Sequence, residues 1–296
     1  MLQTIAVIGA GTMGNGIAHV VAQHGFRVHL TDTRPEALQQ ALQTISNNLD
    51  RQLSKQLIGT DDKTATLANI TIFPSLEKSV ANAQLVIEAA TERTALKLDI
   101  FRQLDKAAPP DCILASNTSS ISITHIASAT TRPEKVIGMH FMNPVPVMRL
   151  VEIINGYATE AAVTSQIVDL SQQLGKVACV VNDYPGFIAN RILMPMINEA
   201  VYSLFEGVAG VAEIDTIMQL GMAHPMGPLR LADLTGLDTC AAILKVMRDG
   251  LGKPQYTPCP LLTNMVEAGK LGVKTGEGFY DYSKGIKQPA VSARFL

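Results

Sequence analysis

Three glycines near the N-terminus have the spacing of a loop that binds phosphate groups. Gly9, Gly11 and Gly14 follow a short apolar run and precede a segment of helical length. In such a loop the first glycine permits a tight turn, the second lets a pyrophosphate approach the backbone, and the third lets the helix pack closely on the strand. Backbone N–H groups and the helix dipole then attract the anion. The pattern predicts a dinucleotide site, and a glycine-rich turn without a ligand is the alternative.

An acidic residue follows at the distance that a dinucleotide site requires. Asp32 ends the next predicted strand, roughly 20 residues beyond the glycines, where an acid can bind both hydroxyls of a ribose. A carboxylate at this position repels a 2′-phosphate, so we expect NAD in preference to NADP. Arg34 stands two residues further on and leaves the use of NADP open.

A histidine and a glutamate lie in two successive apolar runs separated by a short, proline-rich turn at residues 143–146. A carboxylate such as Glu152 is costly to bury in a strand without a partner. An antiparallel return of the chain would bring Glu152 beside His140. A histidine that a carboxylate orients is a good general base, because the acid fixes its tautomer and stabilises the imidazolium. The alternative is a core histidine and an edge-strand glutamate that faces water.

Two more polar residues occupy positions that suit a ligand. Ser119 lies just past the predicted strand 113–115, at the strand end where doubly wound sheets bind ligands. A serine that caps a short helix is the alternative there. Asn190 stands among apolar residues, where an amide needs a buried partner, so a purely structural role is also open.

The elements that must position these residues alternate between strand and helix in the first half of the chain. Such alternation predicts βαβ units and a parallel sheet that is covered on both faces. The predicted strands are 5–8, 28–30, 85–87, 113–115 and 136–137, and the predicted helices are 13–24, 36–57 and 92–107.

The pattern changes after residue 139. The link from the preceding strand to 148–154 is too short for a parallel crossover, which predicts an antiparallel pair. A helix at 163–174 and a strand at 177–181 follow, and the remaining pattern is helical, at 187–205, 214–220, 229–247 and 261–268. We therefore predict an α/β fold: a Rossmann-type, doubly wound, mostly parallel sheet over residues 1–183, followed by a smaller all-α domain over 184–296.

Composition excludes several classes of function. The 296 residues carry a net charge of −2 and no basic run, which argues against nucleic acid as a partner. The four cysteines form no CxxC pair and the histidines show no metal-ligand spacing, so we predict no metal and a reduced, cytoplasmic protein. No apolar stretch is suited to cross a membrane.

Five stretches resemble the 3-hydroxyacyl-CoA dehydrogenase family, and they follow in the family order over nearly the whole chain. They are residues 116–120, 138–152, 183–191, 225–233 and 274–280. The resemblance implies that His140 is the catalytic base and that Glu152 is its partner. It also implies that Ser119 and Asn190 hold the 3-oxygen of the substrate and that Asn143 lines the same site.

The resemblance further implies NAD-dependent oxidation of an L-3-hydroxyacyl-CoA, with 3-hydroxybutyryl-CoA the expected short-chain substrate. Glu92 and Lys97 match positions that line the nicotinamide half of the cofactor site, and Met13 and Asn117 belong to motifs expected to contact NAD. The helical domain is expected to bind substrate and to form a homodimer.

One stretch departs from the family pattern. Relatives carry a lysine-rich segment that grips the phosphates of coenzyme A, whereas residues 51–58 retain only Arg51 and Lys55 as cations. We expect Lys55 to bind the CoA phosphates, and a cation on a solvated helix face is the alternative. The departure leaves open a related dehydrogenase of a CoA-free hydroxy acid such as gulonate. A non-catalytic, crystallin-like NAD-binding protein is a further alternative, which the presence of all four predicted catalytic residues disfavours.

Overall fold

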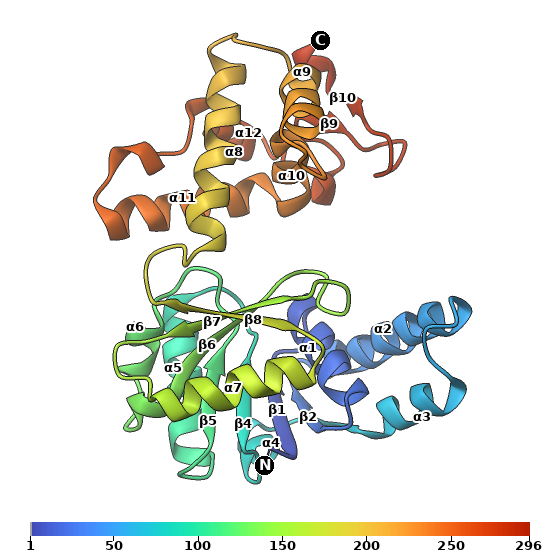
Figure 1. The fold of residues 1–296 in the computed structure, drawn as a ribbon, viewed down its shortest axis with the longest axis vertical. Helices are drawn as coiled ribbons and strands as arrows, with labels where there is room; N and C mark the ends of the chain where they lie inside the picture. Colours follow the sequence, from blue (N-terminus) through green and yellow to red (C-terminus); the bar gives the residue numbers. More distant parts are fainter. Residues whose placement is uncertain (1) are drawn as a thin grey trace. The chain divides into compact units, whose positions relative to one another are not determined.

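A computed structural model describes residues 2–296 and divides the chain into two compact units (Figure 1). The first unit ends at Tyr184 and the second comprises Pro185–Leu296. The division falls one residue beyond the boundary that the loss of strand signals suggested. The first unit holds the loop of Gly9, Gly11 and Gly14.

The first unit is built on an eight-stranded sheet of order β3-β2-β1-β4-β5-β6-β7-β8. Its strands are β1 (Thr4–Ile8), β2 (Arg27–Thr31), β3 (Ile70–Phe73), β4 (Leu85–Glu88), β5 (Ile113–Ser116), β6 (Val136–Phe141), β7 (Leu150–Asn155) and β8 (Val177–Asn182). Strands β1 to β6 pair in parallel, β7 returns antiparallel to β6, and β8 is parallel to β7. The predicted Rossmann-type sheet with one antiparallel return is confirmed.

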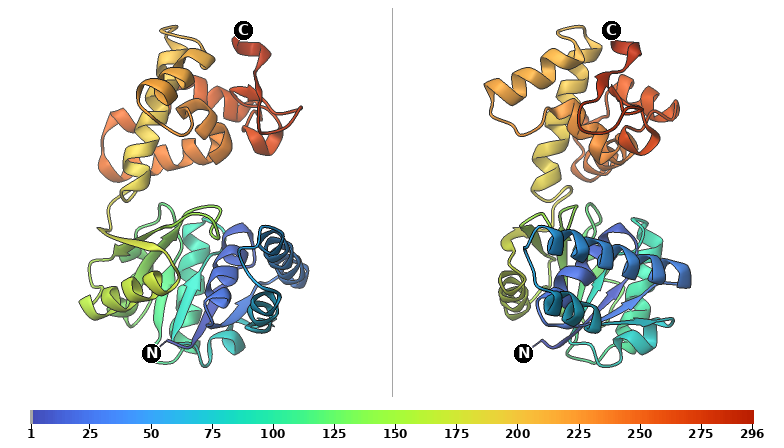
Figure 2. Two further views of the ribbon diagram at one scale, coloured as in Figure 1. Left: turned by 45° about the vertical axis from the view of Figure 1, so that its right-hand side comes forward. Right: turned by 90° about the vertical axis from the view of Figure 1, so that its right-hand side faces the viewer.

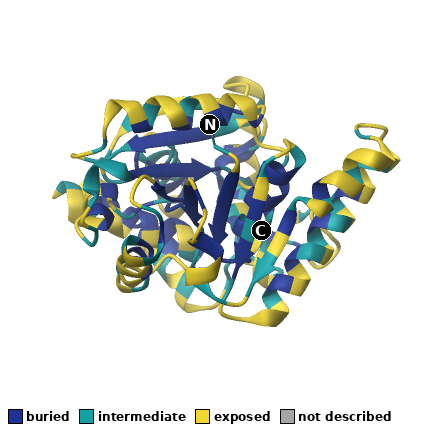
Figure 3. Ribbon diagram, turned by 90° about the horizontal axis from the view of Figure 1, so that it is seen from below, coloured by how far each residue is buried: buried dark blue, intermediate teal, exposed yellow. Residues whose placement is uncertain are grey.

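Helices cover both faces of this sheet, which explains why its central strands are apolar runs without alternation. The longer helices of this unit are α1 (Thr12–Gln23), α2 (Pro35–Ser54), α3 (Thr60–Ala68), α5 (Thr94–Ala107) and α7 (Ala161–Gln173); α4 (Leu76–Val80), α6 (Ile123–Ala127) and the 3-10 turn η1 (Pro133–Lys135) are short. Helices α1, α2 and α7 share one core with the strands. Figure 2 shows α2 and α3 at one end of the sheet and α7 at the other, beside β7 and β8. Seen from below, the central strands of the sheet are buried while the helices expose their outer faces (Figure 3).

Several segments of this unit differ from the sequence prediction, which did not include helices α3, α4 and α6. The helix expected over 36–57 ends at Ser54, and Gln56 adopts a φ of 55°, in the left-handed region, before α3 begins. The edge strand β3 was not predicted, because only four residues pair and three of them are partly or wholly exposed. A strand this short and this exposed leaves little hydrophobic pattern to detect.

The second unit is helical apart from one small ribbon. Its elements are α8 (Ala189–Phe205), α9 (Val211–Thr216), the π-helical turn η2 (Ile217–Gly221), α10 (Pro228–Thr235), α11 (Leu237–Leu251), η3 (Pro254–Tyr256), α12 (Pro260–Glu267), η4 (Val273–Thr275), β9 (Tyr280–Asp281), β10 (Ala290–Val291) and η5 (Ala293–Phe295). The single helix predicted over 229–247 is wrong. Gly236 has a φ of +99°, which ends α10 and turns the chain into α11. The two-residue strands β9 and β10 left no signal in the sequence.

Candidate active site

The three glycines form the loop that their spacing predicts. Gly9 ends β1 with a φ of +102°, and a Cβ atom placed on it would lie 2.7 Å from the carbonyl oxygen of Ala89. A Cβ atom on Gly14 would lie 1.8 Å from the carbonyl oxygen of Gly9, so helix and loop pack against each other without room for a side chain. At Gly11 no described atom lies within 4 Å of such a Cβ. The loop is therefore closed at two glycines and open at the one where a pyrophosphate would approach.

Asp32 is fixed beside this loop by the loop's own backbone. Its Oδ2 accepts a hydrogen bond of 2.8 Å from the N–H of Ala10, and its Oδ1 accepts one of 3.0 Å from the N–H of Arg34. Asp32 and Gly9 line a hollow of about 530 Å³ together with Ala89 of the loop after β4. This volume falls in the range of cofactor sites. The carboxylate of Asp32, which can accept hydrogen bonds from a ribose, and the volume of the hollow fit the adenosine half of a dinucleotide.

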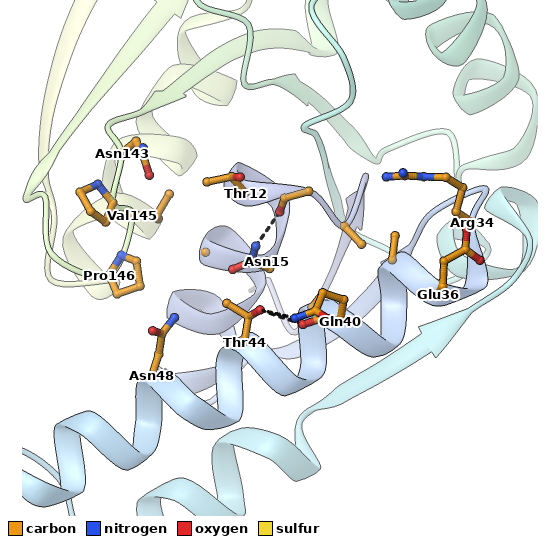
Figure 4. A pocket seen from close by; sticks show the side chains of 16 residues that line it. Thr12, Asn15, Arg34, Glu36, Gln40, Thr44, Asn48, Asn143, Val145 and Pro146 are labelled. Carbon is orange, nitrogen blue, oxygen red and sulfur yellow. Dashed lines mark hydrogen bonds between the residues drawn. The ribbon is translucent and has the colours of Figure 1, made fainter. Parts of the chain in front are cut away.

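A second hollow of about 640 Å³ continues from the loop toward the turn that joins β6 to β7 (Figure 4). Asn15 of α1 lies on one side, where its Nδ2 donates a 2.7 Å hydrogen bond to the carbonyl oxygen of Gly11. Asn143 lies on the opposite side, at the start of the turn. Met13 is half-buried in the first turn of α1 and packs against the core rather than standing among the lining residues of this hollow.

A third hollow of about 770 Å³ lies where the end of α2 faces the same turn. Arg51 and Lys55 supply its positive charge, and Pro144 and Val147 of the turn form its apolar side. Both cations are exposed. The only two cations that residues 51–58 retain thus share one hollow.

His140 and Glu152 form a buried pair. They stand directly opposite each other in the antiparallel register of β6 and β7. Nδ1 of His140 lies 2.7 Å from Oε2 of Glu152, and the two residues are 7% and 2% exposed. The structure therefore brings together the histidine and carboxylate that the sequence placed in successive strands, in the geometry of a base and the group that orients it.

The backbone around Ser119 is held by a glutamate from the neighbouring loop. Oε1 of Glu92 accepts hydrogen bonds from the Oγ1 of Thr118 at 2.6 Å, from the N–H of Ser119 at 2.9 Å and from the N–H of Ser120 at 3.1 Å. Ser119 itself is half-buried. Glu92 thus shapes the turn that presents Ser119, a role beyond the cofactor contact that its position in the sequence suggested.

Lys97 is anchored inside the protein by an acid that sequence reasoning did not single out. Its Nζ lies 2.7 Å and 3.0 Å from the two carboxylate oxygens of Glu88, the last residue of β4, and 3.4 Å from Oε2 of Glu92. Glu88 also accepts a hydrogen bond of 2.6 Å from the Oγ of Ser116. The signal was present, because an acid that ends an apolar strand needs a buried partner.

Asn117 ties two neighbouring strands together at their carboxyl ends. Its Oδ1 accepts a 2.9 Å hydrogen bond from the N–H of Phe141, the residue after His140. Ser119, His140 and Asn117 therefore belong to one edge of the sheet, where doubly wound folds bind ligands. Asn190 belongs to the second unit, where it is buried in the first turn of α8.

Residues 2–296 contain no group of three histidine, cysteine or acidic side chains that could hold a metal ion. None of the helices described is long and apolar enough to cross a membrane.

The fold and this edge of the sheet define a dinucleotide-dependent dehydrogenase: a glycine loop with its acid, next to a buried histidine–carboxylate pair. Comparison with known proteins places the chain more closely. A family model for the 3-hydroxyacyl-CoA dehydrogenase NAD-binding domain matches residues 4–184, and the model for the C-terminal domain of the same family matches residues 186–282. The chain belongs to the 3-hydroxyacyl-CoA dehydrogenase family.

Individual relatives agree over nearly the full length. A 3-hydroxybutyryl-CoA dehydrogenase of Bradyrhizobium diazoefficiens is 51% identical over 287 residues, which cover 97% of each chain. The mitochondrial hydroxyacyl-coenzyme A dehydrogenase of Mus musculus is 41% identical over 95% of this chain and 92% of its own. The crystal structure of an (S)-3-hydroxybutyryl-CoA dehydrogenase from Ralstonia eutropha superposes with a TM-score of 0.93 at 47% identity, covering 96% of this chain and 100% of the other.

Proposed function

We propose that the protein oxidises L-3-hydroxyacyl-CoA to 3-ketoacyl-CoA with NAD, and catalyses the reverse reduction, with 3-hydroxybutyryl-CoA as its substrate. The observation that carries the proposal is the buried contact of 2.7 Å between His140 Nδ1 and Glu152 Oε2. A dehydrogenase of alcohols must remove a proton from the hydroxyl while a hydride leaves the same carbon. A histidine whose second nitrogen is fixed by a carboxylate is suited to that proton transfer.

The two nitrogens of His140 have different tasks in this proposal. Nδ1–H donates to Glu152, which leaves Nε2 as the acceptor of the substrate's 3-hydroxyl proton. The Glu152 carboxylate, which is buried beside it, stabilises the imidazolium that results. In the reductive direction His140 returns the proton to the 3-keto oxygen.

Ser119 and Asn190 orient the oxygen that gains or loses this proton. The hydroxyl of Ser119 and the amide of Asn190 are both able to donate to a keto oxygen. Glu92 supports Ser119 by fixing its backbone N–H at 2.9 Å. Asn143, at the mouth of the second hollow, lines the substrate's path.

NAD in the groove beside Gly11 and Asp32 supplies the hydride acceptor. Gly11 offers an open approach to its pyrophosphate, and Asp32 accepts hydrogen bonds from the adenine ribose while its charge disfavours a 2′-phosphate. Met13 and Asn117 complete the loop and strand end that border the cofactor. Lys97 balances the charge of two acids in the same region.

The CoA portion of the substrate fits the third hollow. Lys55 and Arg51 face its phosphates, and the turn at Pro144 and Val147 contacts its apolar arm. The second unit, from about residue 184 onward, supplies Asn190 and the homodimer contact that the family resemblance implies.

Parallel assays with different substrates and cofactors test the proposed function. Purified protein is mixed with acetoacetyl-CoA and NADH, and the loss of NADH absorbance is followed. The same assay is repeated with NADPH, with longer 3-ketoacyl-CoA esters and with free acetoacetate. We expect fastest turnover with acetoacetyl-CoA and NADH. Turnover of free acetoacetate without turnover of any CoA ester would contradict the proposal and support a CoA-free substrate.

A further inference from the structure

One buried lysine of the first unit has no part in the chemistry proposed above. Lys176 stands immediately before β8 and is 8% exposed. Its Nζ donates hydrogen bonds of 2.6 Å to the carbonyl oxygen of Val145 and 2.8 Å to that of Met148. Both carbonyls belong to the turn at residues 143–148, which we call the β6–β7 turn.

The partners of this ammonium are unusual. Within residues 2–296 no carboxylate forms an ion pair with Lys176. Burial lowers the pKa of Lys176, because the ammonium loses water without gaining a counter-charge. Burying a cation without an acid costs free energy, and here two carbonyl oxygens of the β6–β7 turn take the place of the acid.

The hydrogen bonds and the packing of the β6–β7 turn indicate what Lys176 supports. The N–H groups of Val147 and Met148 both donate 2.9 Å hydrogen bonds to the carbonyl oxygen of Pro144, so the turn is tight. Val145 rests on Gly16 of α1, where a Cβ atom would lie only 2.9 Å from the Cβ of Val145. The turn therefore packs on the helix that begins at the phosphate loop.

The same turn separates two hollows. Pro144 and Pro146 line both the second hollow, which opens from the phosphate loop, and the third, which contains Lys55. Small movements of this turn alter the shape of both. The turn's own hydrogen bonds join its backbone groups to one another, whereas the side chain of Lys176 connects the turn to the start of β8.

We propose that Lys176 is a positioning residue that fixes the β6–β7 turn as the wall on which the acyl-CoA substrate rests. The ammonium donates to the carbonyl oxygens of both Val145 and Met148, and so links these two residues of the turn. Its effect on substrate binding rests on the proposed function; its effect on the turn does not.

The inference predicts an effect on binding rather than on chemistry. His140 and Glu152 are held opposite each other by the ladder between β6 and β7, which does not include the Lys176 side chain. Asp32 and Gly11 hold the cofactor from elements that Lys176 does not touch. Removing the ammonium should therefore loosen the wall and leave the base and the NAD groove in place.

The experiment compares Lys176→Met, which keeps the aliphatic stem, with Lys176→Arg, which keeps the charge. Lys135→Met is the matched control, because Lys135 precedes β6 at the end opposite to the turn and pairs with Glu160 at the surface. For Lys176→Met we expect the KM for acetoacetyl-CoA to rise roughly 10- to 100-fold, the effect of losing charge-assisted hydrogen bonds. The value of kcat and the Kd of NADH should change less than about threefold, and Lys176→Arg should recover part of the KM.

Hydrogen–deuterium exchange gives a readout that is independent of activity. The amides of Val147 and Met148 should exchange faster in Lys176→Met than in the wild type and in Lys135→Met. If the wild type turns over no CoA ester, the proposed function fails, and faster exchange in the turn still supports the positioning role. Unchanged exchange in the turn, or a fall in kcat without a rise in KM, overturns it. If Lys176→Met does not fold, Lys176→Gln, which retains one donor group, is measured in the same way.

Discussion

Glu88 and Lys97 form an ion pair from which solvent is excluded: the residues are 0% and 1% exposed, and Nζ lies 2.7 Å from Oε1. The pair joins the end of β4 to α5. Through the contact of Lys97 with Glu92 it extends to the turn that presents Ser119. The pair thus connects the sheet, through Glu92, to the backbone that presents Ser119.

Removing one partner of this pair should be far more harmful than removing both. Glu88→Gln leaves the buried ammonium of Lys97 without its nearest carboxylate, with Glu92 at 3.4 Å as the remaining one, and we expect the free energy of unfolding to fall by about 3 kcal/mol. The double variant Glu88→Gln with Lys97→Met should recover part of that loss. Urea denaturation of the wild type, both single variants and the double variant gives the coupling free energy between the two side chains. Additive losses would show that the two side chains do not interact energetically.

The proposed base should be essential for turnover and dispensable for cofactor binding. His140→Gln keeps the size and polarity of the side chain but cannot accept the hydroxyl proton. We expect kcat to fall about 10²- to 10⁴-fold, the usual contribution of general base catalysis. The Kd of NADH, measured by its fluorescence, should stay within about twofold of the wild type, because the loops after β1, β2 and β4 line the NAD groove and His140 is not among its lining residues. A kcat near the wild-type value would exclude His140 as the base.

Asp32 should set the choice of cofactor. Asp32→Ala removes the charge that repels a 2′-phosphate, and it also removes the acceptor for the N–H of Ala10. We therefore expect kcat/KM with NADH to fall and the NADH to NADPH preference to narrow by about tenfold or more. Asp32→Asn is the matched control, since it keeps an acceptor while losing the charge. An unchanged preference in both variants would contradict the assignment.

Protonation of Asp233 should stabilise the second unit as the pH falls from 7 to 5. Burial raises the pKa of Asp233 to about 6, although Phe279 N–H, Tyr280 N–H and the Tyr282 hydroxyl all donate to it. Because the folded pKa lies above the unfolded one, the folded state binds the proton more tightly. This group's contribution is complete below the unfolded pKa and is lost as the pH rises through about 6.

The expected gain from Asp233 between pH 7 and pH 5 is about 1 kcal/mol in the free energy of unfolding. Burial also raises the pKa of Asp215, so its contribution has the same sign. In the first unit the pKa of Asp105 is lowered by hydrogen bonds from Thr131 and Arg132, which gives the opposite trend. The informative quantity is therefore the difference between the wild type and Asp233→Asn. Identical pH dependence in the two proteins would rule out Asp233 as the titrating group.

The sequence predicted the fold best where hydrophobic pattern and glycine spacing act together. The strands that carry Gly9, His140 and Glu152 were found because buried runs and a short return between strands leave few alternatives. The break at Gly236 was missed, because apolar periodicity continues on both sides of the glycine while only its backbone conformation changes. Strand β3 was missed because it has only four residues, three of them partly or wholly exposed, which carry almost no pattern.

The sequence predicted the base of the candidate site and its carboxylate partner, but not the buried residues that hold the surrounding backbone in place. His140 and Glu152 stand in adjacent strands, so elementary topology brings them together. Glu88 and Lys176 act through contacts with residues far along the chain, at Ser116 and Val145. No local spacing announces such contacts, because the sheet order and the path of the turn decide them. Their only signature in the sequence is a charge at the end of a predicted strand.

The antiparallel register of β6 and β7 has a consequence for how this chain can vary. His140 faces Glu152 only while the number of residues between them matches the pairing of the strands. A slip by one residue would turn the glutamate to the opposite face of the sheet and leave the histidine without its carboxylate. The number of residues between His140 and Glu152 is therefore constrained by catalysis. An insertion is compatible with turnover only if the turn accommodates all of it and the pairing of β6 with β7 stays unchanged.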